Sequence, residues 1–224
     1  MFIVSDFDGT LAEFSVDPDA VAVNRRSIEA LTRLSEVHRV AILSGRSLEA
    51  LRRLLVDAPT SIILAGSHGA ETAGVEVSPS EEERQVLEAV GRELGEIAGR
   101  FPGAHVEVKP FSRVFHTRPI ADTAAAARAA DEATALMSSF PGEVKLGKEV
   151  VEFSVAAATK GTWISANRLP GEQVVFLGDD VTDEDGFAAL LPGDRGVKVG
   201  PGDTAASERV ADVEAVADFL EGLR

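Results

Sequence analysis

Short apolar runs that end in polar residues recur along the chain and predict buried strands. Four of them, at residues 2–4, 40–43, 62–65 and 174–177, are rich in strand-forming residues. Segments with apolar residues at helical spacing lie within residues 18–35 and at about 47–55. Short buried strands that alternate with helices are typical of a parallel sheet covered by helices on both faces. We therefore expect an α/β core with a Rossmann-like parallel sheet.

The middle of the chain follows a different pattern. Residues 81–98 and the alanine-rich residues 122–137 have helical character. Each is followed by two alternating apolar–polar segments, at 105–110 and 113–118 and then at 143–145 and 148–155. This αββαββ order predicts a smaller α+β domain with half-buried strands. We place this inserted domain at residues 76–155, between core segments 1–75 and 156–224.

The composition narrows the classes of protein. The 224 residues are 45% hydrophobic, as in globular proteins, and carry a net charge of −15, which argues against nucleic-acid binding. The absence of cysteine excludes disulfides and thiolate chemistry, and we expect a cytoplasmic location. No apolar stretch is long enough to span a membrane, and the acidic start of the chain is unlike a signal peptide.

Carboxylates follow two of the expected strands. Asp6 and Asp8 come after the first strand, and the run that contains Asp179, Asp180 and Asp183 follows the fourth. The carboxyl ends of parallel strands meet at one edge of a sheet, so the two groups should lie together. Clustered carboxylates need a cation, and all-oxygen ligands favour magnesium. We expect a Mg²⁺ site that includes Asp6, Asp8, Asp179 and Asp180. Taken alone, the second run would also fit a calcium loop or a helix cap.

Two further residues would complete a phosphate site beside these carboxylates. Ser44 follows the second expected strand and offers a hydroxyl, and Lys160 begins an apolar helix and offers a permanent positive charge. Each has a simpler alternative. Ser44 could cap the next helix, and Lys160 could be an ordinary surface lysine.

Taken in order, residues 6–10, Ser44, Lys160 and residues 178–183 resemble the four motifs of haloacid dehalogenase (HAD) superfamily phosphatases. The resemblance implies that Asp6 is the nucleophile and that Asp8 protonates the leaving alcohol and then activates water. It also implies that Ser44 and Lys160 bind the phosphate, and that the acidic motif ending at Asp183 holds the magnesium ion. We expect the catalytic residues to be Asp6, Asp8, Ser44, Lys160 and Asp183.

Finer features resemble the trehalose-6-phosphate phosphatases within this superfamily. The matching stretches are residues 6–11 with Asp17-Pro18, 44–46, 64–71, 109–110, 116–118, 148, 152, 160–161 and 178–187. The resemblance implies a cap of the αββαββ, or C2B, type. It also implies a set of substrate-binding residues: Thr10, Arg46, His68, Gly69, Lys109, His116, Arg118, Lys148 and Glu152. One departure is Ser154, where the family often has arginine. This departure puts part of the sugar-binding chemistry of the cap in doubt.

The resemblance implies a Mg²⁺-dependent enzyme that removes phosphate from trehalose 6-phosphate to give trehalose, through an aspartyl-phosphate intermediate. The expected partners are a small sugar phosphate and, functionally, a trehalose-phosphate synthase, with no nucleic acid and no membrane. Two alternatives stay open. One is a phosphatase of another sugar phosphate, such as a mannosyl- or glucosyl-phosphoglycerate or sucrose phosphate. The other is a non-catalytic regulatory module that binds a sugar phosphate.

Overall fold

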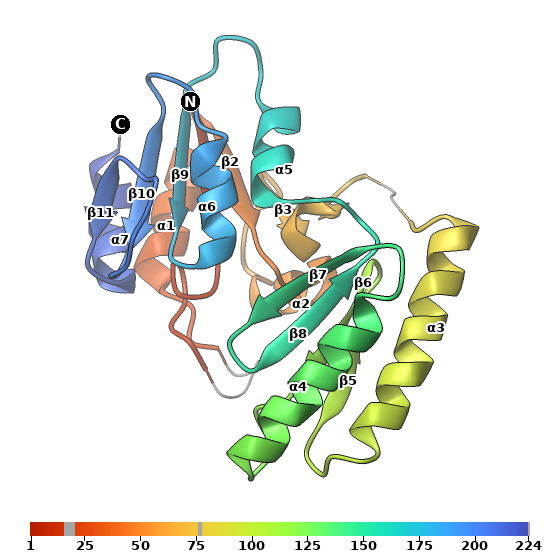
Figure 1. Ribbon diagram of the computed structural model, residues 1–224. Helices are drawn as coiled ribbons and strands as arrows, with labels where there is room; N and C mark the ends of the chain where they lie inside the picture. The colour runs from red at the N-terminus through yellow and green to blue at the C-terminus, as the bar shows by residue number, and fades with distance from the viewer. Residues whose placement is uncertain (16–20, 76–77, 224) are drawn as a thin grey trace. The chain divides into compact units, whose positions relative to one another are not determined.

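The computed structural model describes residues 1–15, 21–75 and 78–223. The chain divides into two compact units. Met1–Glu76 and Ala158–Arg224 form the first, called here the core unit, and Val77–Ala157 form the second, called the inserted unit. Each unit buries its own hydrophobic side chains. Figure 1 shows the helices and strands of both units.

A seven-stranded sheet organises the core unit, in the order β11-β10-β9-β1-β2-β3-β4. Strand β4 is antiparallel to β3, and the other strand pairs of this sheet are parallel in the part of the chain that the structure describes. Because β1 and β9 are direct neighbours, the ends of the strands before Asp6 and Asp179 lie side by side. The strands are β1 (Phe2–Ser5), β2 (Arg39–Leu43), β3 (Ile62–Gly66), β4 (Glu71–Thr72), β9 (Val174–Gly178), β10 (Arg195–Val199) and β11 (Glu208–Val210).

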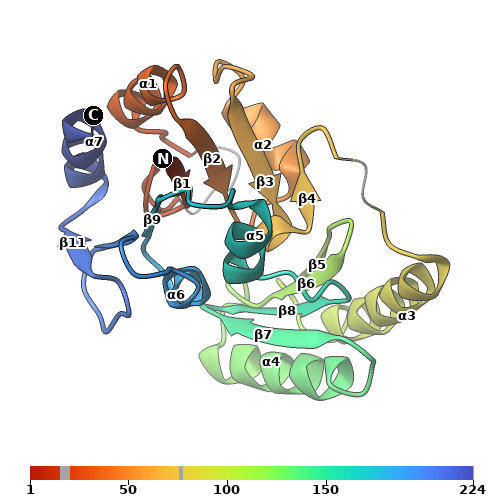
Figure 2. The ribbon, with the colours of Figure 1, turned by 90° about the horizontal axis from the view of Figure 1, so that it is seen from above.

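Helices cover both faces of this sheet (Figure 2). On one face, α1 (Arg25–Leu34), α2 (Leu48–Leu54) and α7 (Val213–Gly222) bury leucine, valine and alanine side chains. On the other face, α5 (Lys160–Asn167) and α6 (Val181–Ala188) pack around Trp163 and Phe187. The α/β fold with a mainly parallel sheet is thereby confirmed.

Helix α1 begins later than the apolar spacing within residues 18–35 indicated. Asn24 caps it, because its side-chain oxygen accepts a hydrogen bond from the backbone N–H of Ser27. Residues 18–20 lie outside the described part of the chain. No helix of the described ranges has the length and apolar character that a membrane span needs.

The inserted unit has the αββαββ order expected from the sequence. Its elements are α3 (Glu81–Ala98), β5 (His105–Val108), β6 (Ser112–His116), α4 (Thr123–Met137), β7 (Glu143–Gly147) and β8 (Val150–Ser154). The four strands form an antiparallel sheet in the order β5-β6-β8-β7. Both helices pack on one face of this sheet, where Phe115, Val151 and Phe153 are buried against them (Figure 2).

The last strand of this sheet is shorter than the alternation over residues 148–155 predicted. Strand β8 begins at Val150, and Lys148 lies with Glu149 in the turn between β7 and β8. Glu149 adopts a positive φ of 64°, which suits a tight turn rather than a strand. Lys148, which the predicted segment 148–155 included, therefore lies outside the strand that carries Glu152.

Candidate functional site

A buried lysine joins two carboxylates at the edge of the parallel sheet. Asp6 directly follows β1, Lys160 is the first residue of α5, and Asp183 lies in the first turn of α6. The Nζ atom of Lys160 lies 2.6 Å from Oδ1 of Asp6 and 2.6 Å from Oδ1 of Asp183. All three side chains are buried, so Lys160 is not a surface lysine.

Burial and neighbouring charges shift the pKa values of this group. Burial raises the pKa of Asp6 well above its ordinary value, and the positive charge of Lys160 opposes this only in part. Burial alone would lower the pKa of Lys160, but the carboxylates of Asp6 and Asp183 outweigh it and raise that pKa. The lysine therefore stays charged at neutral pH, between the carboxyl groups of Asp6 and Asp183.

Asp179 adds a third carboxylate to this group. Oxygens of Asp6, Asp179 and Asp183 all lie within 4.8 Å of one another. Burial, followed by the charge of Asp183, raises the pKa of Asp179 to about 6. Its Oδ1 atom is buried and has no hydrogen-bond partner in the described part of the protein. An unpartnered oxygen within an all-oxygen cluster fits a hard cation such as Mg²⁺.

The backbone around the cluster allows the carboxylates to approach closely. Gly9 has a positive φ of 74°, and a Cβ atom built on it would lie 2.2 Å from Oδ2 of Asp179. A side chain at this position would displace the Asp179 carboxylate. The next residue, Thr10, is buried, and its Oγ1 also lacks a partner among the described residues.

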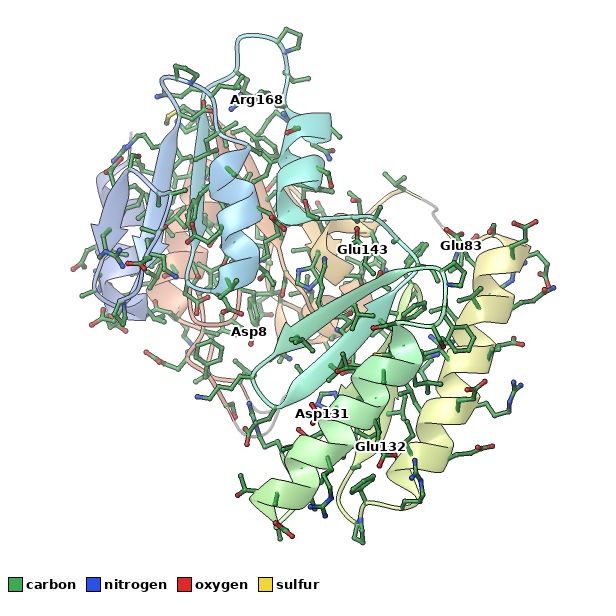
Figure 3. The ribbon with its side chains drawn as sticks, viewed as in Figure 1. Asp8, Glu83, Asp131, Glu132, Glu143 and Arg168 are labelled. Carbon is green, nitrogen blue, oxygen red and sulfur yellow. The ribbon has the colours of Figure 1, made fainter. Side chains whose placement is uncertain are left out.

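Asp8, labelled in Figure 3, pairs with an arginine instead of joining the cluster. Arg46 donates from Nε to Oδ2 of Asp8 and from Nη2 to Oδ1, both at 2.7 Å. The buried hydroxyl of Ser44 accepts a hydrogen bond from the backbone N–H of Arg46 at 3.1 Å. Ser47, and not Ser44, caps α2. The structure thus brings Ser44, Arg46 and Asp8 together.

The expected set of metal ligands is only partly gathered in one place. Asp6 and Asp179 lie together with Asp183, whereas Asp8 is held by Arg46. Asp180 is exposed and caps α6, because its Oδ1 accepts a hydrogen bond from the N–H of Val181 at 2.7 Å.

A tight turn containing His68 supports the loop of Ser44. Ser67 and His68 both adopt positive φ, 50° and 56°, which is uncommon for residues other than glycine. Their N–H groups donate to the carbonyls of Arg46 and Ser44, at 2.7 and 2.9 Å. Gly69 lies against Trp163 of α5, where a Cβ atom would approach to 2.6 Å. The turn therefore connects the loop of Ser44 with the helix that carries Lys160.

Polar side chains of the inserted unit form two small groups on its sheet. Glu152 accepts a hydrogen bond from Ser112 at 2.6 Å and lies 3.5 Å from Nζ of Lys109. His116 lies 3.0 Å from Glu107, and its hydrogen bond is the main cause that lowers the pKa of Glu107. The ring of His116 stacks on that of His105, with 4.5 Å between their centroids.

The other residues expected to bind substrate in the inserted unit lie elsewhere. Arg118 donates to Glu149 at 2.9 Å, beside the turn that carries the exposed Lys148. Sequence reasoning missed Ser112 as a partner of Glu152, since the contact depends on the pairing of β6 with β8. Asp17-Pro18, part of the family resemblance, lies outside the described residues.

Comparison with known proteins identifies the family. A family model described as Trehalose-phosphatase matches residues 4–214. The chain belongs to this family. It is 34% identical to "Trehalose-6-phosphate phosphatase" of Escherichia coli (strain K12), over 96% of this chain and 84% of that protein. It is 35% identical to "Trehalose-phosphate phosphatase" of Mycobacterium marinum, over 84% of this chain, but spans only about half of that protein.

Solved structures agree with this assignment to the trehalose-phosphatase family. A crystal structure titled as a trehalose-6-phosphate phosphatase related protein superposes with a TM-score of 0.84 at 26% identity. The match covers 99% of this chain and 96% of that one. The resemblance to HAD-type phosphatases is therefore confirmed, and so is the prediction that the chain is a phosphatase.

Proposed function

We propose that this member of the trehalose-phosphatase family is a Mg²⁺-dependent enzyme that hydrolyses trehalose 6-phosphate to trehalose and phosphate. The observation that carries the proposal is the group of the buried Asp6, Lys160 and Asp183 with the half-buried Asp179. It offers a nucleophile, a fixed cation and oxygen ligands within a few ångströms of one another. The substrate is inferred from the relatives, which are named as trehalose-6-phosphate or trehalose-phosphate phosphatases.

In the first step, a carboxylate oxygen of Asp6 attacks the phosphorus atom and forms an acyl phosphate. The bond between phosphorus and the sugar oxygen breaks, and Asp8 gives its proton to that oxygen. The ammonium of Lys160 stabilises negative charge on the phosphoryl oxygens. The hydroxyl of Ser44 and the guanidinium of Arg46 offer further hydrogen-bond donors. Asp8 has to be protonated in this step, so the substrate must displace it from Arg46.

In the second step, water attacks the phosphorus atom of the aspartyl phosphate while Asp8 takes a proton from that water. The acyl–phosphate bond breaks, which restores the Asp6 carboxylate and releases phosphate. Asp6 and Asp179, oriented by Asp183, would hold Mg²⁺. When bound, the ion neutralises charge on the phosphoryl oxygens and on the clustered carboxylates. Hydrolysis of a phosphate monoester is very slow without a catalyst, so we expect all of these groups to act together.

We further propose that the inserted unit, over about the predicted residues 76–155, is a cap domain that binds the sugar. Its two polar groups, Lys109 with Glu152 and His116 with Glu107, offer the donors and acceptors that sugar hydroxyls need. Arg118 and Lys148, which lie at the same end of the sheet as His116, are also predicted to bind the substrate. A cytoplasmic location and a functional link to a trehalose-phosphate synthase stay predictions.

Phosphate release from a panel of sugar phosphates, with and without a chelator, tests the proposal. The panel contains trehalose 6-phosphate, sucrose 6-phosphate and glucosyl- and mannosyl-3-phosphoglycerate. We expect the highest kcat/KM with trehalose 6-phosphate and no activity once Mg²⁺ is removed. Asp6→Asn should lower kcat by about 10⁴-fold or more, because the nucleophile is lost. Asp131→Asn removes one exposed carboxylate from α4 (Figure 3) and should leave kcat unchanged.

Each alternative predicts a different result in this experiment. Faster turnover of another sugar phosphate would contradict the proposed substrate. Full activity in the presence of the chelator would contradict the metal requirement. Tight binding of trehalose 6-phosphate without any phosphate release would favour the regulatory module.

A further inference from the structure

Lys198 is a buried charged residue that the proposed chemistry leaves unused. It lies on β10, and its side chain is only 4% exposed. Its neighbours in the strand, Val197 and Val199, point into the hydrophobic core. The ammonium of Lys198 donates a hydrogen bond to the backbone carbonyl of Asp179. Among the described residues, no carboxylate forms an ion pair with it.

A buried lysine at this position of β10 lowers the stability of the fold. Burying an ammonium group costs free energy unless the group is paired, and a single carbonyl compensates for only part of that cost. After Arg195, the strand otherwise consists of glycine and valine, so an apolar side chain would suit the fold better at this buried position. Packing therefore gives no reason for a lysine here, and the contact with Asp179 does.

The backbone of Asp179 is held at both of its polar groups, and Lys198 holds the carbonyl. Lys198 is opposite Gly178 in the pairing of β10 with β9, and Gly178 directly precedes Asp179. From the other direction, Oδ2 of Asp183 accepts hydrogen bonds from the N–H groups of Asp179 and Asp180, at 3.0 and 2.9 Å. Both backbone polar groups of Asp179 are thus held by buried side chains, while its Oδ1 has no partner in the described structure.

We propose that Lys198 is a positioning residue for the metal site: it fixes the carbonyl of Asp179 so that the Asp179 carboxylate is turned toward the cation. This inference rests on the proposed function, since it assumes that Asp179 is a metal ligand. Partners of this kind, one shell away from a metal, orient the ligand, and their loss typically weakens metal affinity 10- to 100-fold.

Calorimetric titration of the metal-free protein with Mg²⁺ tests this role without using activity. Lys198→Met has a similar length and no donor, and we expect it to bind Mg²⁺ about 10-fold more weakly or worse. The melting temperature of the metal-free variant should be unchanged or higher, because an uncompensated buried charge is removed. Loss of positive charge by itself would tighten Mg²⁺ binding, so weaker binding identifies the positioning effect.

Arg209→Met is the matched control. Arg209 is opposite Lys198 in the pairing of β10 with β11, and it also donates to backbone carbonyls, those of Gly200 and Gly202. We expect this variant to keep its Mg²⁺ affinity within about 2-fold, since neither carbonyl belongs to a ligand.

Three results would overturn the inference. If Lys198→Met binds Mg²⁺ as tightly as the parent or more tightly, the contact does not position Asp179. If Lys198→Met is unfolded without metal, the lysine has a structural role. A parent protein that binds no Mg²⁺ overturns the proposed metal dependence and this inference with it, whereas the first two results leave the proposed function intact.

Discussion

At the scale of single residues, the imidazole of His68 leaves no room for a side chain on Gly45. A Cβ atom built on Gly45 would lie 2.8 Å from Cε1 and 2.9 Å from Nε2 of the imidazole. Gly45→Ala must therefore displace either the ring or the loop that carries Ser44 and Arg46. We expect kcat, measured by phosphate release, to fall about 10-fold, and overpacking of this kind costs about 1–3 kcal/mol of stability.

A double-mutant cycle separates this steric effect from a direct contact of His68 with substrate. His68→Gly removes the ring and suits the positive φ of this position. The loss of kcat caused by Gly45→Ala should be much smaller in the His68→Gly background, because the group it collides with is gone. Equal losses in the two backgrounds would show that the ring does not restrict the loop.

Three of the predicted site residues share one property, which is their position directly after a buried strand. Asp6, Ser44 and Asp179 follow β1, β2 and β9, and the sheet then brings them to one edge. The pairing of Arg46 with Asp8 could not be predicted in this way, because it joins two loops whose side-chain directions are not set by strand alternation.

Ser154 shows the same limit in the inserted unit. From the sequence, it is only a departure from the arginine that the family often has at this position. In the structure its hydroxyl bonds with the backbone of Ala156, while the neighbouring Glu152 is held by Ser112 and Lys109. Glu152 is therefore oriented without an arginine, which a single sequence could not reveal because the contacts cross strands.

At the scale of secondary structure, the strands of the core that could be predicted are those with continuous hydrophobic sequences. Strands β1, β2, β3 and β9 are continuous apolar runs, and the sequence indicated all of them. Strand β10 was missed, because Lys198 interrupts its apolar pattern. Strands β4 and β11 were missed because two or three residues are too few to show a period. Strand β10, which was missed, therefore carries Lys198, the residue proposed to orient Asp179.

The close packing of α5 against α6 permits a prediction at this scale. A Cβ atom on Gly161 would lie 2.3 Å from the backbone oxygen of Asp185, an atom that cannot rotate away. Gly161→Ala should push the two helices apart and move Lys160 relative to Asp183. We expect kcat to fall about 10-fold or more and the free energy of unfolding to fall by about 1–3 kcal/mol, measured by phosphate release and urea denaturation.

Gly95→Ala is the matched control for this substitution. Gly95 lies inside α3, and a Cβ atom there would meet nothing within 4 Å. Alanine at an open position inside a helix should stabilise the protein by about 0.5–1 kcal/mol and leave kcat unchanged. If Gly161→Ala were also stabilising and active, the close approach of α5 and α6 would not be what positions Lys160.

At the scale of the whole molecule, the net charge of −15 does not describe the active site. Part of the acidic excess lies on exposed helices, where Arg26 pairs with Glu214, Asp218 and Glu221 on α7. Such exposed pairs contribute little to stability, and surface charge mainly favours solubility. The buried carboxylates are a separate set, and their mutual repulsion should make the stability of the entire chain depend on a cation.

Thermal unfolding of the metal-free protein should therefore depend on Mg²⁺ and on pH together. Burial and the charge of Asp183 raise the pKa of Asp179 from 3.8 to about 6, so the folded state binds a proton that the unfolded state releases between these values. The stability from this group is fully present below about pH 4 and is lost as pH rises through about 6.

Bound Mg²⁺ replaces the proton, so its effect on the melting temperature should be larger at about pH 7.5 than at about pH 5. At a fixed concentration of about 100 times its Kd at about pH 7.5, the ion should add about 2.7 kcal/mol at that pH, which corresponds to a rise of roughly 5–10 °C in Tm. Asp179→Asn should remove most of this rise, and an equal rise at both pH values would contradict the coupling.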